Sequence, residues 1–264
     1  MKTIYKIART ELQTLFYSPV AWLILVIFTF QASMAFTDML GGYVRSQSLG
    51  YRLWSVTEGT FGGMRGLFTQ MQQYLYLYIP LLTMGLMSRE LSSGSIKLLY
   101  SSPVTNVQII LGKYLSMMIY GLVLIGILMI YVIFTLFAVK SADFSAMLSG
   151  ILGLYLLLCA YAAIGLFMSS VTSYQVVAAM GTLAILAVLN YVKGMWQDIE
   201  FVRDITYWLA ISGRANEFVR GLICSEDVMY FVIVIVLFLM LSIIRLQGRF
   251  NRFPFVVKLT DGFH

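Results

Sequence analysis

The chain has 264 residues, of which 60% are hydrophobic and 11% are charged, and its formal net charge at pH 7 is +6. A soluble domain carries about a quarter charged residues, so this composition excludes an ordinary soluble protein and indicates a membrane protein. The single histidine is the last residue, His264, which argues against a histidine metal site and against a Ser-His-Asp triad. We therefore expect no metal ion and no catalytic residue.

The first expected element is an amphipathic helix over residues 4–17. Ile4, Ile7 and Leu12 lie near one helical face, and Lys6 and Arg9 lie largely on the other. This pattern is typical of a helix that lies in the membrane interface. The alternative is that these residues extend the first span, but the Ser-Pro pair at positions 18 and 19 favours a separate helix, because proline suits a helix start.

Five long stretches contain no Asp, Glu, Lys, Arg or His: 12–37, 66–88, 114–139, 144–192 and 228–244. A helix needs about 20 residues to cross the hydrocarbon layer, so the fourth stretch holds two spans, divided by a polar turn at 169–173. The sequence thus predicts an all-α polytopic membrane protein, one domain over 1–264, with six transmembrane helices. They lie near 19–38, 67–88, 115–138, 147–168, 174–192 and 228–246.

Six spans place both termini on one side, and the basic residues indicate which side. Ten of the eighteen Lys and Arg residues share that side with only three acidic residues, so both termini are expected in the cytoplasm, in the cell (inner) membrane. Anionic lipid headgroups then account for the positive charge, and no nucleic acid is needed as a partner. The ten are Lys2, Lys6, Arg9, Arg89, Lys97, Lys113, Arg245, Arg249, Arg252 and Lys258.

Two absences concern the energy source. A charge at a helix centre costs about 2.5 to 3.5 kcal/mol on insertion scales, and proton-coupled carriers keep such charges where they work. The charge-free stretches argue against a proton-coupled carrier, although a sodium-driven one stays possible. The chain also lacks the GxxxxGK[ST] phosphate loop, so it is not an enzyme by itself. If it transports, a separate ATPase has to dock on its cytoplasmic face.

The only long cytoplasmic loop of this topology covers residues 89–113. We expect two short helices in it. The first covers 89–99, interrupted by Ser92, Ser93 and Gly94, and the second begins after the Ser-Ser-Pro at 101–103 and continues into the third span.

This loop and the end of the second span resemble the membrane subunits of the type-2 ABC exporters, a family that includes the gliding-motility and nitrous-oxide-reductase maturation permeases. Ser95 stands where threonine is usual, and a second similar segment covers 211–231. The matching residues, in order, are Pro80-Leu81-Leu82-Thr83-Met84, Glu90, Ser93-Gly94, Leu98-Leu99, Ser102-Pro103-Val104 and Gly112-Lys113.

The resemblance implies a permease subunit of an ABC exporter whose loop forms a coupling helix in a cleft of an ABC ATPase. That ATPase would bind ATP and Mg, and this chain would bind no cofactor. Glu90 stands at the position of the family glutamate; its alternative role is a solvated partner of Arg89 or Lys97. A re-entrant hairpin is implied in the outer loop 193–227, where an ordinary aromatic belt is the alternative. The expected coupling residues are Arg89, Glu90, Ser93, Gly94, Ser95, Lys97, Leu98, Ser102 and Pro103.

The second span begins with an unusual cluster of Gln and Tyr, and the fifth span carries small residues that permit close helix packing. We expect some of these residues in a substrate pathway or at the interface with a second copy of the permease; packing within one subunit is the alternative. A scaffold without transport is the alternative function. The residues concerned are Gln70, Gln73, Tyr74, Tyr78, Ala178 and Gly181.

Overall fold

The computed structural model describes residues 2–48, 66–96, 104–138, 144–191, 218 and 225–250. Its long described elements are all helices, which confirms the predicted all-α, polytopic membrane architecture. They are α1 (Lys2–Tyr17), α2 (Pro19–Ser48), α3 (Leu67–Thr83), α4 (Gly85–Ser93), α6 (Asn106–Ala138), α7 (Phe144–Val171), α8 (Gln175–Tyr191) and α11 (Ser225–Phe250).

Four of these helices contain stretches long and apolar enough to cross a membrane: Pro19–Gly42, Asn106–Phe137, Phe144–Val171 and Ser225–Arg249. Helices α3 and α8 have 17 residues each, at the lower limit for a span. An unbroken second span over 67–88 was predicted, and this is wrong, because the helix is interrupted at Met84. Helix α2 extends ten residues beyond the predicted end at 38.

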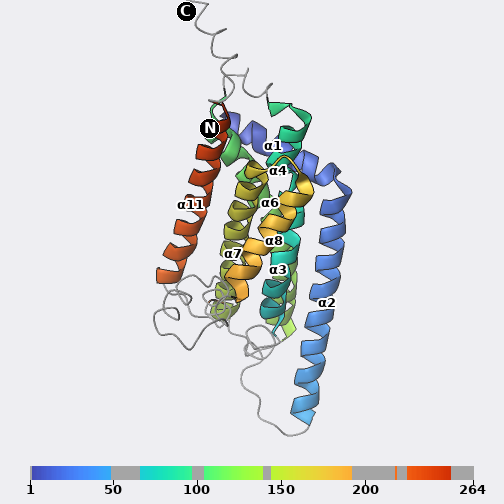
Figure 1. The fold of residues 1–264 in the computed structure, drawn as a ribbon. Helices are drawn as coiled ribbons and strands as arrows, with labels where there is room; N and C mark the ends of the chain where they lie inside the picture. Colours follow the sequence, from blue (N-terminus) through green and yellow to red (C-terminus); the bar gives the residue numbers. More distant parts are fainter. Residues whose placement is uncertain are drawn as a thin grey trace, which may run out of the picture.

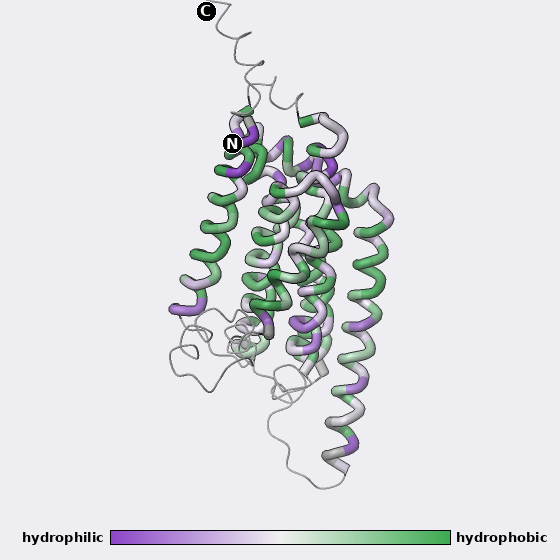
Figure 2. Tube along the Cα trace, viewed as in Figure 1, coloured by the Kyte–Doolittle hydropathy of each residue, from purple (hydrophilic) through white to green (hydrophobic). Residues whose placement is uncertain are grey.

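The helices α2, α3, α6, α7, α8 and α11 run side by side along the long axis of the bundle, and α1 lies across one end (Figure 1). Helix α7 is the central one, because it packs against α3, α4, α6, α8 and α11. In its most apolar stretch of 18 residues, 72% are buried. The outer helices carry exposed apolar side chains such as Phe30, Ile130 and Val236. Hydrophobic residues predominate along α11, as its colouring shows (Figure 2). This surface suits lipid, which is as apolar as these side chains.

Glycines allow the closest helix contacts. A Cβ on Gly165 of α7 would lie 2.1 Å from Thr83 Oγ1 of α3, and one on Gly153 would lie 2.3 Å from Phe218 Cβ. Phe218 is the one described residue of the predicted outer loop outside α11, and it is fully buried beside Phe231. The rest of that loop up to α11, with its predicted re-entrant hairpin, lies outside the described residues.

Helix α1 is the predicted amphipathic helix. It ends at Tyr17, and α2 begins at Pro19 after a bend at Ser18. Its packing partner is α6, where Gly112 makes room for it: a Cβ there would lie 2.7 Å from Ile7 Cγ2 and 3.3 Å from the Ile4 carbonyl oxygen. The start of α1, helix α4 and the end of α11 lie at the same end of the bundle (Figure 1). We call it the α1 end.

The predicted turn at 169–173 is wrong in its first half. Helix α7 continues to Val171, so Ser169 and Ser170 are helical, and α8 begins at Gln175. Both serine side chains are buried, and their hydroxyls find local or neighbouring backbone partners, as buried polar groups require. As a helical residue of α7, Ser169 contacts the backbone of α4.

Candidate functional site

The predicted coupling segment is one short helix followed by a turn. Helix α4 ends at Ser93 because Gly94 adopts the left-handed conformation with φ 70°, which glycine tolerates without steric cost. A helix over 89–99 with an interruption at 92–94 was predicted. The interruption is confirmed, since Gly94 and Ser95 are not helical and Ile96 is helical again; the predicted start is wrong, because the helix begins at Gly85, and residues 97–99 lie outside the described residues. The serines and glycine at 92–94 therefore end the helix.

The second predicted helix of the loop is the start of α6. Thr105 caps it: Gln108 N–H donates to Thr105 Oγ1 at 3.3 Å, and Thr105 N–H donates to Gln108 Oε1 at 3.3 Å. This reciprocal capping box fixes where the helix begins. From there α6 runs without a break into the third span, as predicted.

The break between α3 and α4 is held open by a side chain from α7. Ser169 Oγ accepts hydrogen bonds from Met87 N–H at 2.9 Å and Ser88 N–H at 3.1 Å, and donates to the Met84 carbonyl at 2.9 Å. In a continuous helix these two amides would bond to carbonyls four residues back. A side chain inserted into that ladder is a recognised cause of a kink, and Pro80 removes one further donor from α3.

Three charged side chains from three helices meet behind α4. Lys113 Nζ of α6 lies 2.5 Å from Glu11 Oε1 of α1 and 2.7 Å from Glu90 Oε1 of α4. The Lys113 side chain is 1% exposed, and those of Glu11 and Glu90 are 13% and 20% exposed. We call these three residues the ion triad. It connects α1, α4 and α6 through one ammonium group.

The ion triad carries one more carboxylate than it has cations. The second oxygens, Glu11 Oε2 and Glu90 Oε2, are buried and have no hydrogen-bond partner among the described residues. Burial raises the pKa of Glu90, nearby Glu11 adds to the rise, and Lys113 and Arg89 oppose it. The alternative role of Glu90 as a solvated loop charge is wrong, because its carboxylate points into the protein and pairs with Lys113.

The other predicted coupling residues lie around α4 and its end. Arg89 and Ser93 are exposed, and Gly94 and Ser95 are half-buried; the Ser93 and Ser95 hydroxyls are 2.8 Å apart. Ser92, which is also exposed, and Ser93 form the outward surface of α4. Four predicted residues, Lys97, Leu98, Ser102 and Pro103, lie outside the described residues.

The predicted pathway or interface residues separate into two groups. Tyr78 is buried, and its hydroxyl donates to Gln31 Oε1 of α2, so it packs within the chain. Gln73 is exposed, and Gln70 and Tyr74 are half-buried. These three therefore retain some surface on α3.

Helix α8 shows the same division. Ala178 is fully buried within the chain, and a Cβ on Gly181 would lie 2.3 Å from Met168 Cε of α7. The exposed surface of α8 includes Val177, Met180 and Ala184 instead.

Sequence reasoning missed Glu11, Ser169 and the burial of Lys113. A signal existed for Glu11: it is the only acidic residue of α1, and it lies between Ala8 and Leu15, the two buried positions of that helix. Ser169 gave no such signal, because a serine beside a polar turn is ordinary. In the part of the chain that the structure describes, no group of three or more His, Cys, Asp or Glu side chains could hold a metal ion.

The site is therefore a short helix, α4, at the α1 end. It follows α3 after a break and is bound to α1 and α6 by ion pairs. A search among curated proteins finds no match. The family model of the ABC-2 family transporter protein matches residues 5–252, which include every described helix except the first residues of α1. The chain therefore belongs to the ABC-2 family of transporter proteins.

Proposed function

We propose that this chain is the membrane-spanning permease subunit of an ATP-driven ABC exporter. A separate ABC ATPase binds ATP and Mg, docks on the outward surface of α4 and drives the permease. Two copies of the chain, or this chain and a related permease, pass the substrate between them by alternating access. Membership of the ABC-2 family supports a membrane component of such a transporter, and ATP coupling and export are the further steps of the proposal.

The observation that carries the proposal is the set of contacts that α4 makes with α1, α6 and α7. Ser169 keeps it jointed to α3, and the ion triad binds it to α1 and α6. A partner that pushes on Ser92 or Ser93 therefore moves α4 about the joint and pulls on α1 and α6. Rigid-body motion of a short helix against packed spans is an established way to pass a displacement into a membrane domain.

The α1 end is proposed to face the cytoplasm of the cell (inner) membrane. The exposed side chains of Lys6, Arg9, Arg89 and Arg245 lie at that end, and basic residues favour the cytoplasmic side. Arg249 also lies there, and its Nη2 donates to the Val171 carbonyl at the end of α7 at 2.6 Å. Both chain ends and the ATPase contact are then on the side where ATP is present.

A tryptophan on the outward surface of α4 tests the proposal. Ser92 is exposed, and its hydroxyl only donates to the Arg89 carbonyl at 3.0 Å, so Ser92→Trp adds bulk where the ATPase docks without disturbing the ion triad. Ser48 is a matched control: it is an exposed serine at the end of α2, at the far end of the bundle, and its hydroxyl donates to the Arg45 carbonyl at 2.7 Å.

The tagged chain is purified from native membranes, and the ATPase that accompanies it is reconstituted with each variant in lipid. We expect wild type and Ser48→Trp to retain the ATPase and to raise its activity, and Ser92→Trp to lose at least about tenfold in association, which is about 1.4 kcal/mol. Retention of a partner whose activity never changes would favour a scaffold. If no nucleotide-binding protein accompanies the wild-type chain, the proposal is wrong.

A further inference from the structure

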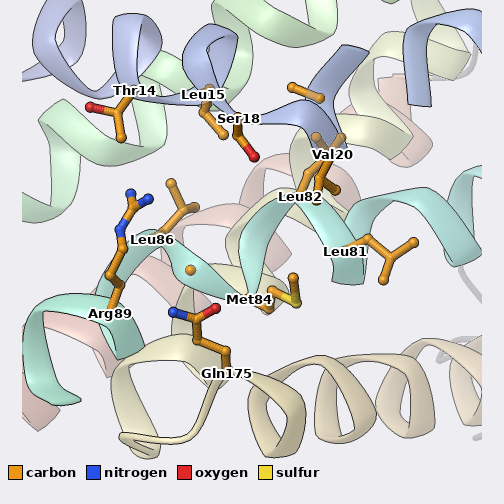
Figure 3. A pocket seen from close by; sticks show the side chains of 12 residues that line it. Thr14, Leu15, Ser18, Val20, Leu81, Leu82, Met84, Leu86, Arg89 and Gln175 are labelled. Carbon is orange, nitrogen blue, oxygen red and sulfur yellow. The ribbon is translucent and has the colours of Figure 1, made fainter. Parts of the chain in front are cut away.

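A cavity of about 140 Å³ opens at the α1 end between the α1–α2 junction, the break between α3 and α4, and the start of α8 (Figure 3). The cavity is separate from the ion triad, because Glu11, Glu90 and Lys113 do not line the cavity. Its walls come from α1, α2, α3, α4 and α8. The proposed coupling motion would move α4 relative to the other helices.

Three polar side chains from three segments point into this cavity: Arg89 of α4, Gln175 of α8 and Ser18 between α1 and α2 (Figure 3). Among the described residues, none of these side chains forms a hydrogen bond or an ion pair. The neighbouring carboxylate of Glu90 is already bound by Lys113. A guanidinium, an amide and a hydroxyl line one cavity, and none has a hydrogen-bond partner among the described residues. Such a set of donors fits an anion with several oxygen acceptors, above all a phosphate.

The opposite wall is apolar and continues onto the lipid-facing surface. Val20, Leu81 and Met84 form it, and Leu81 is 44% exposed. The depth in the membrane is marked by Trp22, which is exposed and donates from Nε1 to the Phe16 carbonyl; tryptophan is enriched at the headgroup level. The cavity thus joins a polar site at headgroup depth to an apolar surface at acyl-chain depth.

We propose that this cavity binds the phosphate headgroup of an anionic phospholipid, with one acyl chain along Leu81. Free phosphate shares the headgroup chemistry but leaves the apolar wall uncovered, so the lipid is the ligand that uses both sides. A bound lipid touches α1, α4 and α8 at once and restrains α4 at its joint with α3. This proposal needs only the membrane and not the ATPase, so it stands apart from the proposed function.

Two variants remove the site in different ways. Arg89→Gln removes the cation. Gly85→Leu is designed to fill the cavity, since Gly85 lines it and a Cβ there meets no atom within 4 Å. Each has a matched control: Arg9→Gln changes an exposed arginine of the same end outside the cavity, and Gly126→Leu adds the same side chain at another glycine with open space.

The purified full chain is titrated in neutral detergent with phosphatidylglycerol, phosphatidylcholine and inorganic phosphate, and bound lipid is counted by native mass spectrometry. We expect phosphatidylglycerol to bind in preference to phosphatidylcholine, and both site variants to bind it at least about tenfold more weakly, the loss expected for one charge-assisted contact. Both controls should match wild type. Equal binding by both site variants and wild type, or displacement of the lipid by inorganic phosphate alone at equal concentration, would overturn the proposal.

Discussion

Replacement of Lys113 by methionine tests the ion triad most directly. Methionine is close in length to lysine and is tolerated in apolar cores, so Lys113→Met removes the charge with little change in volume. The carboxylates of Glu11 and Glu90 then lose the ammonium group that lies 2.5 and 2.7 Å from them. Both remain buried, and each repels the other.

The size of the effect follows from which charges are left unpaired. Removal of one partner from a buried ion pair costs about 3–5 kcal/mol, because the remaining charge stays buried. Glu90→Gln behaves differently: Lys113 keeps Glu11, the new amide oxygen still accepts from Nζ, and one excess negative charge is gone. We therefore expect Lys113→Met to lower the free energy of unfolding by about 3–5 kcal/mol, and Glu90→Gln to change it by no more than about 1 kcal/mol.

The measurement is reversible unfolding in mixed micelles, followed by tryptophan fluorescence. A compensated variant separates charge from packing: Lys113→Met combined with Glu11→Gln and Glu90→Gln removes all three charges, and it should recover at least half of the lost free energy. If Lys113→Met is no less stable than Glu90→Gln, or if the compensated variant is as unstable as Lys113→Met, then the triad is not the ionic contact described above.

Three further predictions concern close contacts and pH. Gly112→Ala pushes α1 away from α6 and should lower the free energy of unfolding by about 1–3 kcal/mol. Its control is Gly126→Ala, where a Cβ meets nothing within 4 Å, and this variant should be neutral or more stable by up to about 1 kcal/mol. Equal effects of the two variants on unfolding in micelles would contradict the tight contact. Ser169→Ala leaves two buried amide donors of α4 without their acceptor and should cost about 1–3 kcal/mol, while the adjacent Ser170→Ala, whose hydroxyl only donates to its own helix, should cost less; the reverse order would exclude Ser169 as the group that holds the break. The raised pKa of Glu90 means that the folded state binds a proton more tightly than the unfolded state, so stability falls as pH rises from about 4.5 through that raised pKa, and a pH titration of Glu90→Gln should lack this fall.

The sequence predicted much of the architecture because lipid imposes a simple rule. A span must be apolar over about 20 residues and must satisfy its backbone internally, so the long helices α2, α6, α7 and α11 follow from composition alone. The rule does not predict a break inside an apolar stretch. Residues 79–88 contain no charge and look like uninterrupted span; Pro80 weakens the helix there, but the contact with Ser169 from α7, which places the break at Met84, is visible only in the structure.

The candidate site divides in the same way. Order and spacing in the loop predicted a coupling segment that includes part of α4, with Glu90 as its notable residue, and this role stays a prediction. They did not reveal that Glu90 points inward, because its partner Lys113 and the third member Glu11 are distant in sequence, and Glu11 had been counted as an ordinary interfacial charge. Arg89 and Ser93 could be named from the loop alone, but only the structure shows that Ser93 lies on the outward surface of α4 and that Arg89 lines the cavity.

By itself, the sequence determined that this chain crosses a membrane several times as helices. It also predicts that both termini are cytoplasmic and that a separate protein hydrolyses ATP. These properties depend on each segment's own transfer from water to lipid and on motifs that are absent, so they need no neighbours. Only the tertiary structure decided that Ser169 breaks the second apolar helix, that Lys113 joins Glu11 and Glu90, and that Arg89 faces a cavity. Those contacts connect residues 23 to 102 positions apart, and side chains so far apart in the chain meet only when the packed helices bring them together.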